Sequence, residues 1–207
     1  MLEPVEGPKT RALRMPRQTW QIDARTLVHE PGAWGKSWKL LEGAIRLDAL
    51  IDGVPHFVRL VLPGQLVGAE MMLKGRFSFR AQSVVPSVLM PWPTLPEQDV
   101  SEELLVSFAS EYCDQADQML LCHGNAESRL THLLRLLTRD TKPETGGGRL
   151  LVMPGLRDIA DITDLTMETV SRCITRLRTS GALDDLGRRQ FRLWVERLVR
   201  QPATQGE

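Results

Sequence analysis

Apolar residues between positions 156 and 177 repeat at helical spacing in two short blocks. A polar stretch, 163–166, separates the blocks, and the Thr166 hydroxyl can accept a hydrogen bond from a free backbone N–H in the first turn of the second block. Gly181 fits the end of that second helix. The two apolar faces consist of Leu156, Ile159, Ala160 and Ile162, and of Val170, Ile174 and Leu177. This pattern predicts a helix-turn-helix, although a surface helix-turn of any small α domain has the same spacing.

Polar positions on the second predicted helix point away from its apolar face. The outward residues are Met167, Glu168, Ser171, Arg172, Thr175 and Arg176, whereas Cys173 falls on the inward side. Arg, Glu and Ser on the first two turns of such a helix can reach base edges in a DNA major groove. Residues 183–195 then predict a hairpin with a turn at Leu186-Gly187. Arg188 and Arg189 near its tip suit phosphate contacts, with a solvated turn as the alternative.

The pattern between Trp20 and Trp92 is different, because short apolar runs of β type alternate with turn signals. Asp52-Gly53 and Pro63-Gly64 are two of these turns. The runs cover residues 26–28, 38–41, 44–51, 56–62, 77–85 and 88–90. Six or more short strands at this spacing predict a β-sandwich or a jelly-roll barrel.

A long helical run follows, and acidic residues at its start favour the N-terminal end of a helix. Its apolar residues form one stripe at steps of three and four: Leu105, Phe108, Tyr112, Ala116 and Met119. The stripe would pack on the barrel in a monomer, or against a second copy in a coiled-coil-like seam, which we prefer. Gly124 breaks the pattern as a natural hinge, and a further helix is expected over 126–137.

The charges are balanced overall but unevenly distributed. The 207 residues carry no formal net charge, which argues against indiscriminate nucleic-acid binding. Residues 97–123 hold seven acids and no Lys or Arg, whereas residues 166–200 hold eight Arg and four acids. The C-terminal end is therefore locally basic, as phosphate binding requires.

The cysteines and the lengths of the apolar runs indicate the cellular compartment. The three cysteines are scattered, with no CxxC pair, so we expect a reducing cytoplasm. No apolar run approaches the roughly 20 residues of a membrane span, and the first residues lack the apolar region of a signal peptide. We therefore expect a cytoplasmic protein without membrane contact.

The segment LRDIADITDLTMETVSRCITRLRTSGAL resembles the recognition segment of the CRP/FNR superfamily of bacterial transcription regulators, and residues 168–172 carry most of that resemblance. HEPGAWGKSWKLLEGAIRL, VLPGQLVGAE and FRAQSV resemble the cyclic-nucleotide-binding-type barrel of the same family. ESRLTHLLRLLTRD resembles the first helix of its DNA-binding domain, slightly closer to the cyanobacterial nitrogen-control branch than to the catabolite branch. The resemblance extends over nearly the whole chain after the first twenty residues.

The resemblance implies an α+β fold with an N-terminal β jelly-roll, a long dimerisation helix and a C-terminal winged helix-turn-helix. The expected boundaries are a flexible basic arm over 1–20, a β-barrel effector domain over 21–98, a dimerisation helix over 99–123 and a DNA-binding domain over 124–207.

It also implies a homodimer on double-stranded DNA, with RNA polymerase as a further expected partner. The operator would be an inverted repeat with TGA-like half-sites. The expected DNA-binding residues are Thr166, Glu168, Thr169, Ser171, Arg172, Arg176, Arg188 and Arg189. We expect the two threonines to contact phosphates, and Glu168, Ser171 and Arg172 to face the bases.

The barrel departs from the family pattern where the effector would bind. Members that bind cyclic AMP place Arg-Ser or Arg-Thr before the Ala of the last barrel motif, but Phe79-Arg80 precedes Ala81 here. We therefore do not expect cyclic AMP. A pocket for another small anion, such as an organic acid, could be framed by Glu70, Arg76, Arg80 and Tyr112; solvated strand residues without an effector are the alternative.

We expect no metal or cofactor. No cysteine precedes Cys113, so the iron–sulfur ligation of the oxygen-sensing branch is absent, and the four histidines are well separated, which leaves open only a haem ligand among them. The sequence thus favours a transcription regulator over two alternatives, a ligand-sensing signalling protein without DNA binding and a jelly-roll enzyme. The lack of a close metal-ligand or nucleophile–base set argues against the enzyme.

Overall fold

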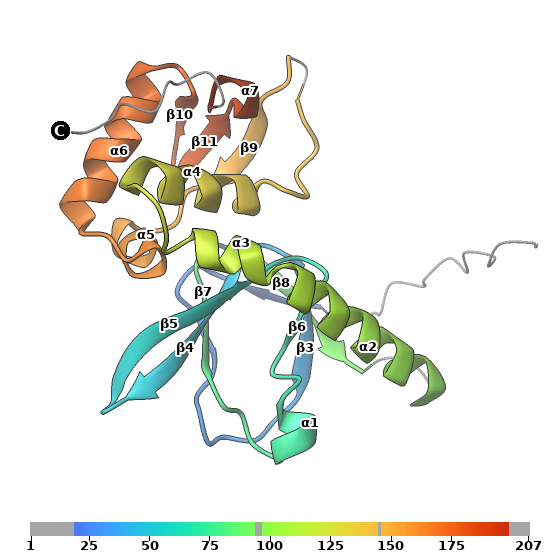
Figure 1. Ribbon diagram of the computed structural model, residues 1–207. Coiled ribbons are helices and arrows are strands. Elements are labelled where there is room, and N and C mark those ends of the chain that lie inside the picture. Colours follow the sequence, from blue (N-terminus) through green and yellow to red (C-terminus); the bar gives the residue numbers. More distant parts are fainter. Residues whose placement is uncertain (1–18, 94–96, 145, 199–207) are drawn as a thin grey trace, which may run out of the picture.

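The computed structural model describes residues 19–93, 97–144 and 146–198. Figure 1 shows a β-barrel at one end, a C-terminal α/β part at the other, and a helical segment that joins them. The predicted basic arm lies outside the described residues up to position 18, and its last residue, Trp20, begins strand β1. None of the described helices is long and apolar enough to cross a membrane.

The barrel consists of two antiparallel four-stranded sheets, which confirms the predicted jelly-roll. One sheet has the order β1-β8-β3-β6, and its strands are Trp20–Ile22, Ser87–Trp92, Ser37–Glu42 and Leu66–Val67. The other has the order β2-β7-β4-β5, and its strands are Leu27–His29, Arg80–Ser83, Ile45–Ile51 and Val54–Val61. Buried aliphatic side chains from both sheets, including Leu40, Ile45, Val61 and Leu89, fill the space between them.

Local chemistry explains the turns of the barrel. Asp52 and Gly53 join β4 to β5 with φ of 52° and 77°, the two positive values that a type I′ hairpin needs. The run expected over 77–85 forms a shorter strand, β7, because residues 71–79 are mostly taken by helix α1, Met71–Lys74, and the loop after it. The helix α1 caps the end of the barrel far from the C-terminal part (Figure 1).

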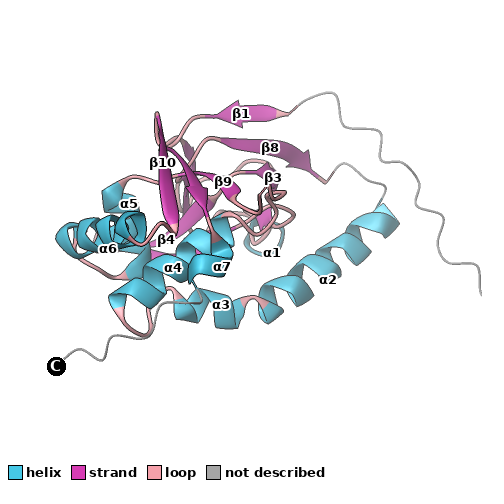
Figure 2. Ribbon diagram, turned by 90° about the horizontal axis from the view of Figure 1, so that it is seen from above, coloured by secondary structure: helices cyan, strands magenta, loops and turns pink. Residues whose placement is uncertain are grey.

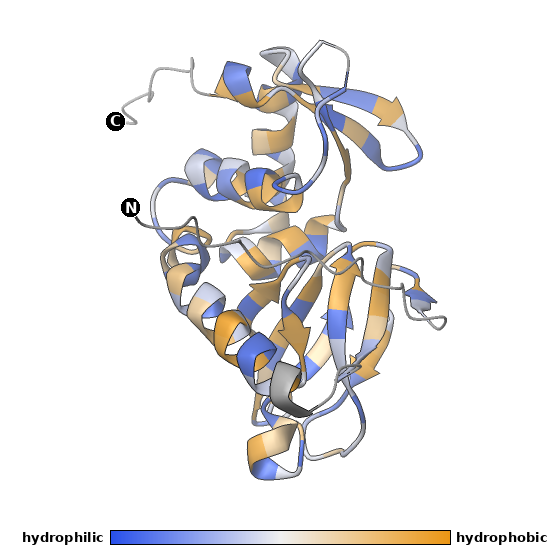
Figure 3. Ribbon diagram, turned by 90° about the vertical axis from the view of Figure 1, so that its right-hand side faces the viewer, coloured by the Kyte–Doolittle hydropathy of each residue, from blue (hydrophilic) through white to orange (hydrophobic). Residues whose placement is uncertain are grey.

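The helix expected over 99–123 is present as two consecutive helices, α2 (Glu97–Cys113) and α3 (Gln115–Leu120). Asp114 stands between them, but helical hydrogen bonds continue across it, since its N–H donates to Ser110 and its carbonyl accepts from Gln118. Figures 2 and 3 show this segment alongside the strands of the barrel, with apolar stretches of ribbon along α2 in Figure 3.

The C-terminal part combines four helices with a small antiparallel sheet. The helices are α4 (Ala126–Leu137), α5 (Leu156–Thr163), α6 (Met167–Thr179) and α7 (Val195–Leu198). The sheet has the order β10-β11-β9, from Leu183–Gly187, Gln190–Leu193 and Arg149–Val152. Its core is continuous with buried barrel residues such as Leu60, Leu62 and Val84, so the two parts are packed against each other.

Candidate nucleic-acid interface

Helices α5 and α6 form the helix-turn-helix that the sequence predicts. The helix α5 ends at Asp164, whose φ and ψ of 50° place it in the left-handed region, and its N–H donates to the Ala160 carbonyl. Thr166 then caps α6, because its hydroxyl accepts a hydrogen bond from the Thr169 N–H at 3.2 Å. Val170, Cys173 and Leu177 are buried. The second helix is thus held against the core along one face, and the predicted core position of Cys173 is confirmed.

Arg129 of α4 stabilises the turn between the two helices. Its guanidinium donates to the backbone carbonyls of Thr163 and Asp164 at 3.1 and 3.2 Å. These carbonyls lie at the end of α5, where no helical N–H is available to them. Sequence reasoning missed Arg129, since no local pattern links a residue of α4 to a turn 34 positions later.

The outward face of α6 presents the predicted base-reading residues to solvent. The side chains of Glu168 and Arg172 are 79% and 64% exposed and lie 3.6 Å apart as an i,i+4 pair. Ser171 and Arg176 are also exposed. The side chains of Thr166 and Thr169 meet at the start of the helix, with their hydroxyl oxygens 2.9 Å apart. The structure therefore brings all six predicted residues of this segment onto one end and one face of α6.

Strands β10 and β11 form the predicted hairpin, but its turn lies later than expected. Arg188 and Arg189 are themselves the two turn residues, with φ of 51° and 64°, instead of Leu186-Gly187. Both arginines are exposed. A Cβ placed on Gly155 would lie 3.5 Å from a guanidinium nitrogen of Arg189, so the Arg189 side chain lies close to the start of α5. The hairpin thus carries Arg189 next to the helix-turn-helix, with Arg188 beside it in the turn.

An ion pair that the sequence pattern did not indicate joins this hairpin to α6. Arg178 lies 3.3 Å from Asp185, which joins the end of α6 to β10. The Asp185 carboxylate also accepts a hydrogen bond from the Gly187 N–H just before the turn. The hairpin therefore contacts the C-terminal end of α6, and the exposed arginines of both elements belong to one basic surface.

The predicted effector residues are less closely grouped. Glu70 stands at the start of α1 and accepts a hydrogen bond from the Ser78 N–H at 3.2 Å, and Arg80 lies 3.6 Å from Glu30. Arg76 is exposed in the same loop region. Tyr112 lies on α2 and is 74% exposed. The ion pairs that join α2 to the barrel use its Glu103 and Glu111 instead.

Aromatic packing fills the barrel next to Glu70. The rings of His29 and Phe77 are stacked with their centroids 3.8 Å apart, and a Cβ on Gly68 would approach the Phe77 ring to 2.5 Å. Burial lowers the pKa of His29, although the Glu70 charge and the Phe79 carbonyl oppose the shift. A neutral imidazole in apolar packing suits a structural histidine.

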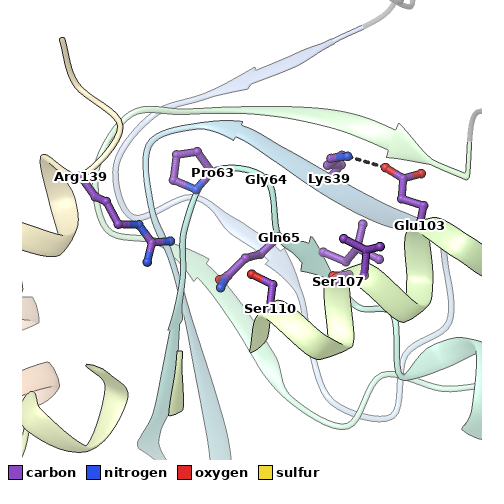
Figure 4. A pocket seen from close by; sticks show the side chains of 10 residues that line it. Lys39, Pro63, Gly64, Gln65, Glu103, Ser107, Ser110 and Arg139 are labelled. Carbon is purple, nitrogen blue, oxygen red and sulfur yellow. Dashed lines mark hydrogen bonds and ion pairs between the residues drawn. The ribbon is translucent and has the colours of Figure 1, made fainter. Parts of the chain in front are cut away.

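A separate small cavity of about 170 Å³ lies where β3, the Pro63-Gly64 turn and α2 meet. Figure 4 shows its polar lining, in which Lys39 is paired with Glu103 and Arg139 approaches from the chain after α4. None of the predicted effector residues lines this cavity. Within the described ranges, no group of three or more His, Cys, Asp or Glu side chains is placed to hold a metal ion.

Comparison with known proteins agrees with this geometry, although no protein-family model matches the chain. The chain is 32% identical over 177 residues to the nitrogen fixation regulation protein FixK of Rhizobium meliloti strain 1021, which covers 84% of this chain and 78% of that protein. It is 33% identical over 151 residues to the transcriptional activatory protein AadR of Rhodopseudomonas palustris, which covers 68% of this chain and 62% of that protein.

Solved structures of regulators share the fold. FixK2 from Bradyrhizobium japonicum superimposes with a TM-score of 0.67 at 25% identity, over 91% of this chain and 98% of that one. A CRP-family transcriptional regulator from Thermus thermophilus gives a TM-score of 0.69 at 22% identity, over 87% of this chain and 95% of that one. The predicted fold class is thereby confirmed, and the chain belongs to the CRP/FNR family, whose members are DNA-binding transcription regulators and not enzymes.

Proposed function

We propose that two copies of the chain form a homodimer that binds an inverted-repeat operator through helix α6 and the β10–β11 hairpin. The observation that carries this proposal is the outward face of α6, where Glu168, Ser171 and Arg172 are exposed on the first two turns. A two-fold dimer presents two such helices to successive major grooves, so half-site centres should lie about 10–11 base pairs apart.

Each exposed residue of this face has a matching partner on DNA. Arg172 can donate two hydrogen bonds to O6 and N7 of a guanine, and Glu168 can accept one from a cytosine amine. Ser171 is small enough to admit a thymine methyl group. Together these contacts favour a TGA-like half-site. Thr166, Thr169, Arg176, Arg188 and Arg189 lie around the reading face and supply phosphate contacts.

The dimer is supported by the apolar stripe on α2 and α3. Leu105, Phe108, Tyr112 and Met119 are between 43% and 74% exposed in the single chain. The helix reaches the barrel through other positions, such as Glu103 and Glu111, so the stripe is left uncovered. A second copy of the same stripe would bury it in a coiled-coil-like seam.

The barrel would receive the regulatory signal in this proposal. Phe79 and Arg80 stand where cyclic-AMP-binding relatives have a phosphate-binding pair, so a different small anion near Glu70, Arg76 and Arg80 is our proposal for the effector. Tyr112 would join this group only through the dimer seam, since it is exposed in the single chain. Because the proposed role is that of a transcription regulator, we also propose RNA polymerase as a partner and the cytoplasm as the site of action.

Selection from a pool of random duplexes tests the proposal directly. The full chain is incubated with the pool, and bound duplexes are recovered and sequenced over several rounds. We expect an inverted repeat with a guanine in each half-site. Recovery of no repeat, or of duplexes no richer in repeats than the starting pool, would contradict the proposed mode of binding.

A further inference from the structure

A buried arginine lies at the boundary between the barrel and the DNA-binding part. Ile45 and Leu47 of β4 point into the barrel core, so the alternating residues Arg46 and Asp48 point to the opposite face of the sheet. That face is covered by helix α5, and the side chains of Arg46 and Asp48 are only 5% and 2% exposed. A charged pair is therefore enclosed at the junction of the two parts.

The guanidinium of Arg46 divides its donors between the two parts. Its Nε and Nη2 donate to Oδ1 of Asp48 in the same strand, at 2.9 and 2.7 Å. The third nitrogen, Nη1, donates to Oδ2 of Asp161 on α5 at 3.1 Å and lies 3.8 Å from Oδ1 of Asp158. Asp48 thus orients the guanidinium, and the remaining donor bridges to the first helix of the helix-turn-helix.

Because the Arg46 guanidinium is buried, its charge is stable only while its hydrogen-bond partners stay in place. Desolvation works against the charged form of Arg46, but the hydrogen bonds and charges of Asp48 and Asp161 outweigh it and raise the pKa of the guanidinium. Removing one partner from a buried pair leaves an uncompensated charge, which is strongly destabilising. Without Arg46, the carboxylates of Asp48, Asp158 and Asp161 would face one another across the boundary.

A second arginine at the same boundary provides a natural comparison. Arg25 donates a hydrogen bond to Asp158 at 3.1 Å; its own side chain is 55% exposed, whereas that of Asp158 is 8% exposed. Water screens the exposed guanidinium of Arg25, so this pair should contribute less than one whose arginine is buried. The apolar core shared by the two parts supplies attraction without direction, since hydrophobic burial is non-directional. Two arginines therefore make directional contacts across the boundary, and Arg46 is the one whose guanidinium is buried.

We propose that Arg46 is a positioning residue for operator recognition, which holds α5, and with it the recognition helix α6, at one orientation on the barrel. The helix α5 packs on α6, and the docked arrangement leaves the reading face of α6 exposed. A dimer must present two reading faces at one spacing, so a fixed orientation lowers the cost of binding both half-sites. The expected effect of Arg46 on operator binding rests on the proposed function.

The test compares four variants of the full chain: Arg46→Met, Asp161→Asn, their double variant, and Arg25→Ala as the matched control. For each, the affinity for the selected operator and for a random duplex is measured by titration. Arg46→Met should lower operator affinity about tenfold, because the competent orientation is less populated, and leave random-duplex affinity within about twofold. Arg25→Ala should change neither by more than about twofold, because the Arg25 guanidinium is exposed and Asp158 still has the Arg46 guanidinium 3.8 Å away.

The double variant separates positioning from general destabilisation. If the two residues act through one contact, Asp161→Asn should weaken operator binding in the wild-type background and have little further effect once Arg46 is Met. Additive effects, an equal loss on both duplexes, or a folded Arg46→Met with operator affinity within about twofold of wild type would overturn the proposal. Asp161 is 45% exposed, so Asp161→Asn decides the question if Arg46→Met does not fold.

A measurement without DNA keeps this proposal separate from the proposed function. Backbone hydrogen exchange in α5 and β4 should be faster in Arg46→Met than in wild type, and unchanged in Arg25→Ala. Unchanged exchange in a folded Arg46→Met would overturn the proposal. If the wild type selects no operator while exchange responds as expected, the proposed binding mode fails and the positioning contact stands.

Discussion

The side chains of Arg172 and Arg189 belong to the same basic surface but should act differently on DNA. Arg172 stands on the exposed face of α6, where a good bidentate contact with guanine would contribute about 1–3 kcal/mol of discrimination. Arg172→Ala should therefore relax the preference for that guanine and largely preserve non-specific binding. Competition titrations with operators changed at the single guanine would show this as a flattened ranking.

Arg189→Ala is the matched control at the turn of the hairpin. Because a phosphate contact carries no sequence information, this variant should weaken all duplexes alike and reduce the salt dependence by about one phosphate contact. A guanine preference that survives Arg172→Ala, or a loss of ranking in Arg189→Ala, would mean that other residues face the bases.

Individual residues were predictable where their role depends on near neighbours in sequence. Thr166 caps a helix that begins one residue later, and Asp52-Gly53 closes a hairpin between adjacent strands, so both were identified from the pattern. Arg46 and Asp161 are 115 positions apart, and no local pattern pairs them. The DNA-binding roles of the exposed residues on α6 and the hairpin stay predictions.

At the scale of elements, Glu103 is one of two carboxylates that join α2 to the barrel. Glu103 pairs with Lys39 and accepts a hydrogen bond from the Trp92 indole at 2.8 Å. Burial opposes the charged form, but these two partners outweigh it and hold the pKa of Glu103 below its ordinary value. The charge of Glu103 therefore stabilises the folded state at neutral pH.

Glu103→Gln should lower the free energy of unfolding by about 1 kcal/mol at neutral pH. A carboxylate with a lowered pKa contributes its stability above the unfolded pKa and loses it as the pH falls through the folded pKa. The difference between wild type and variant should therefore shrink below about pH 4. Urea unfolding across this range measures it, with the exposed neighbour in Glu102→Gln as control; a difference that persists in acid would contradict the assignment.

The elements themselves were largely predictable, because apolar periodicity distinguishes strands from helices. The division of the long helix at Asp114 was not predictable, because the residues that contact Asp114 come from distant parts of the sequence. Oδ2 of Asp114 accepts a hydrogen bond from Gln65 at 2.8 Å, and Oδ1 accepts one from Arg139 at 3.2 Å. The four-residue helix α1 was also missed, since a single turn is too short to show a period.

At the scale of the whole molecule, the sequence predicted the order of the parts but not how they are packed. The barrel residues Leu60, Leu62 and Val84 share one core with α4 and α5, and Arg46 crosses the same boundary. These residues lie on the outer face of barrel strands or just past the ends of those strands, and a strand pattern alone does not assign such positions to a partner. The orientation of α6 therefore depends on contacts between the barrel and the C-terminal part, and not on the C-terminal part alone.

The stability of a dimer should depend on the apolar stripe along α2 and α3. If the stripe on α2 forms a two-fold seam, Phe108→Asp places a carboxylate where an apolar side chain would be buried, and an unpaired buried charge is costly. Phe108 is 43% exposed in the single chain, so the fold of one copy should survive the change. Val106→Asp is the matched control, because Val106 is 63% exposed on the same helix but lies away from the stripe. Sedimentation should give a dimer for wild type and for the control, and a monomer without operator affinity for Phe108→Asp. A monomeric wild type at micromolar concentration, or a dimer disrupted equally by both changes, would count against a seam along this stripe.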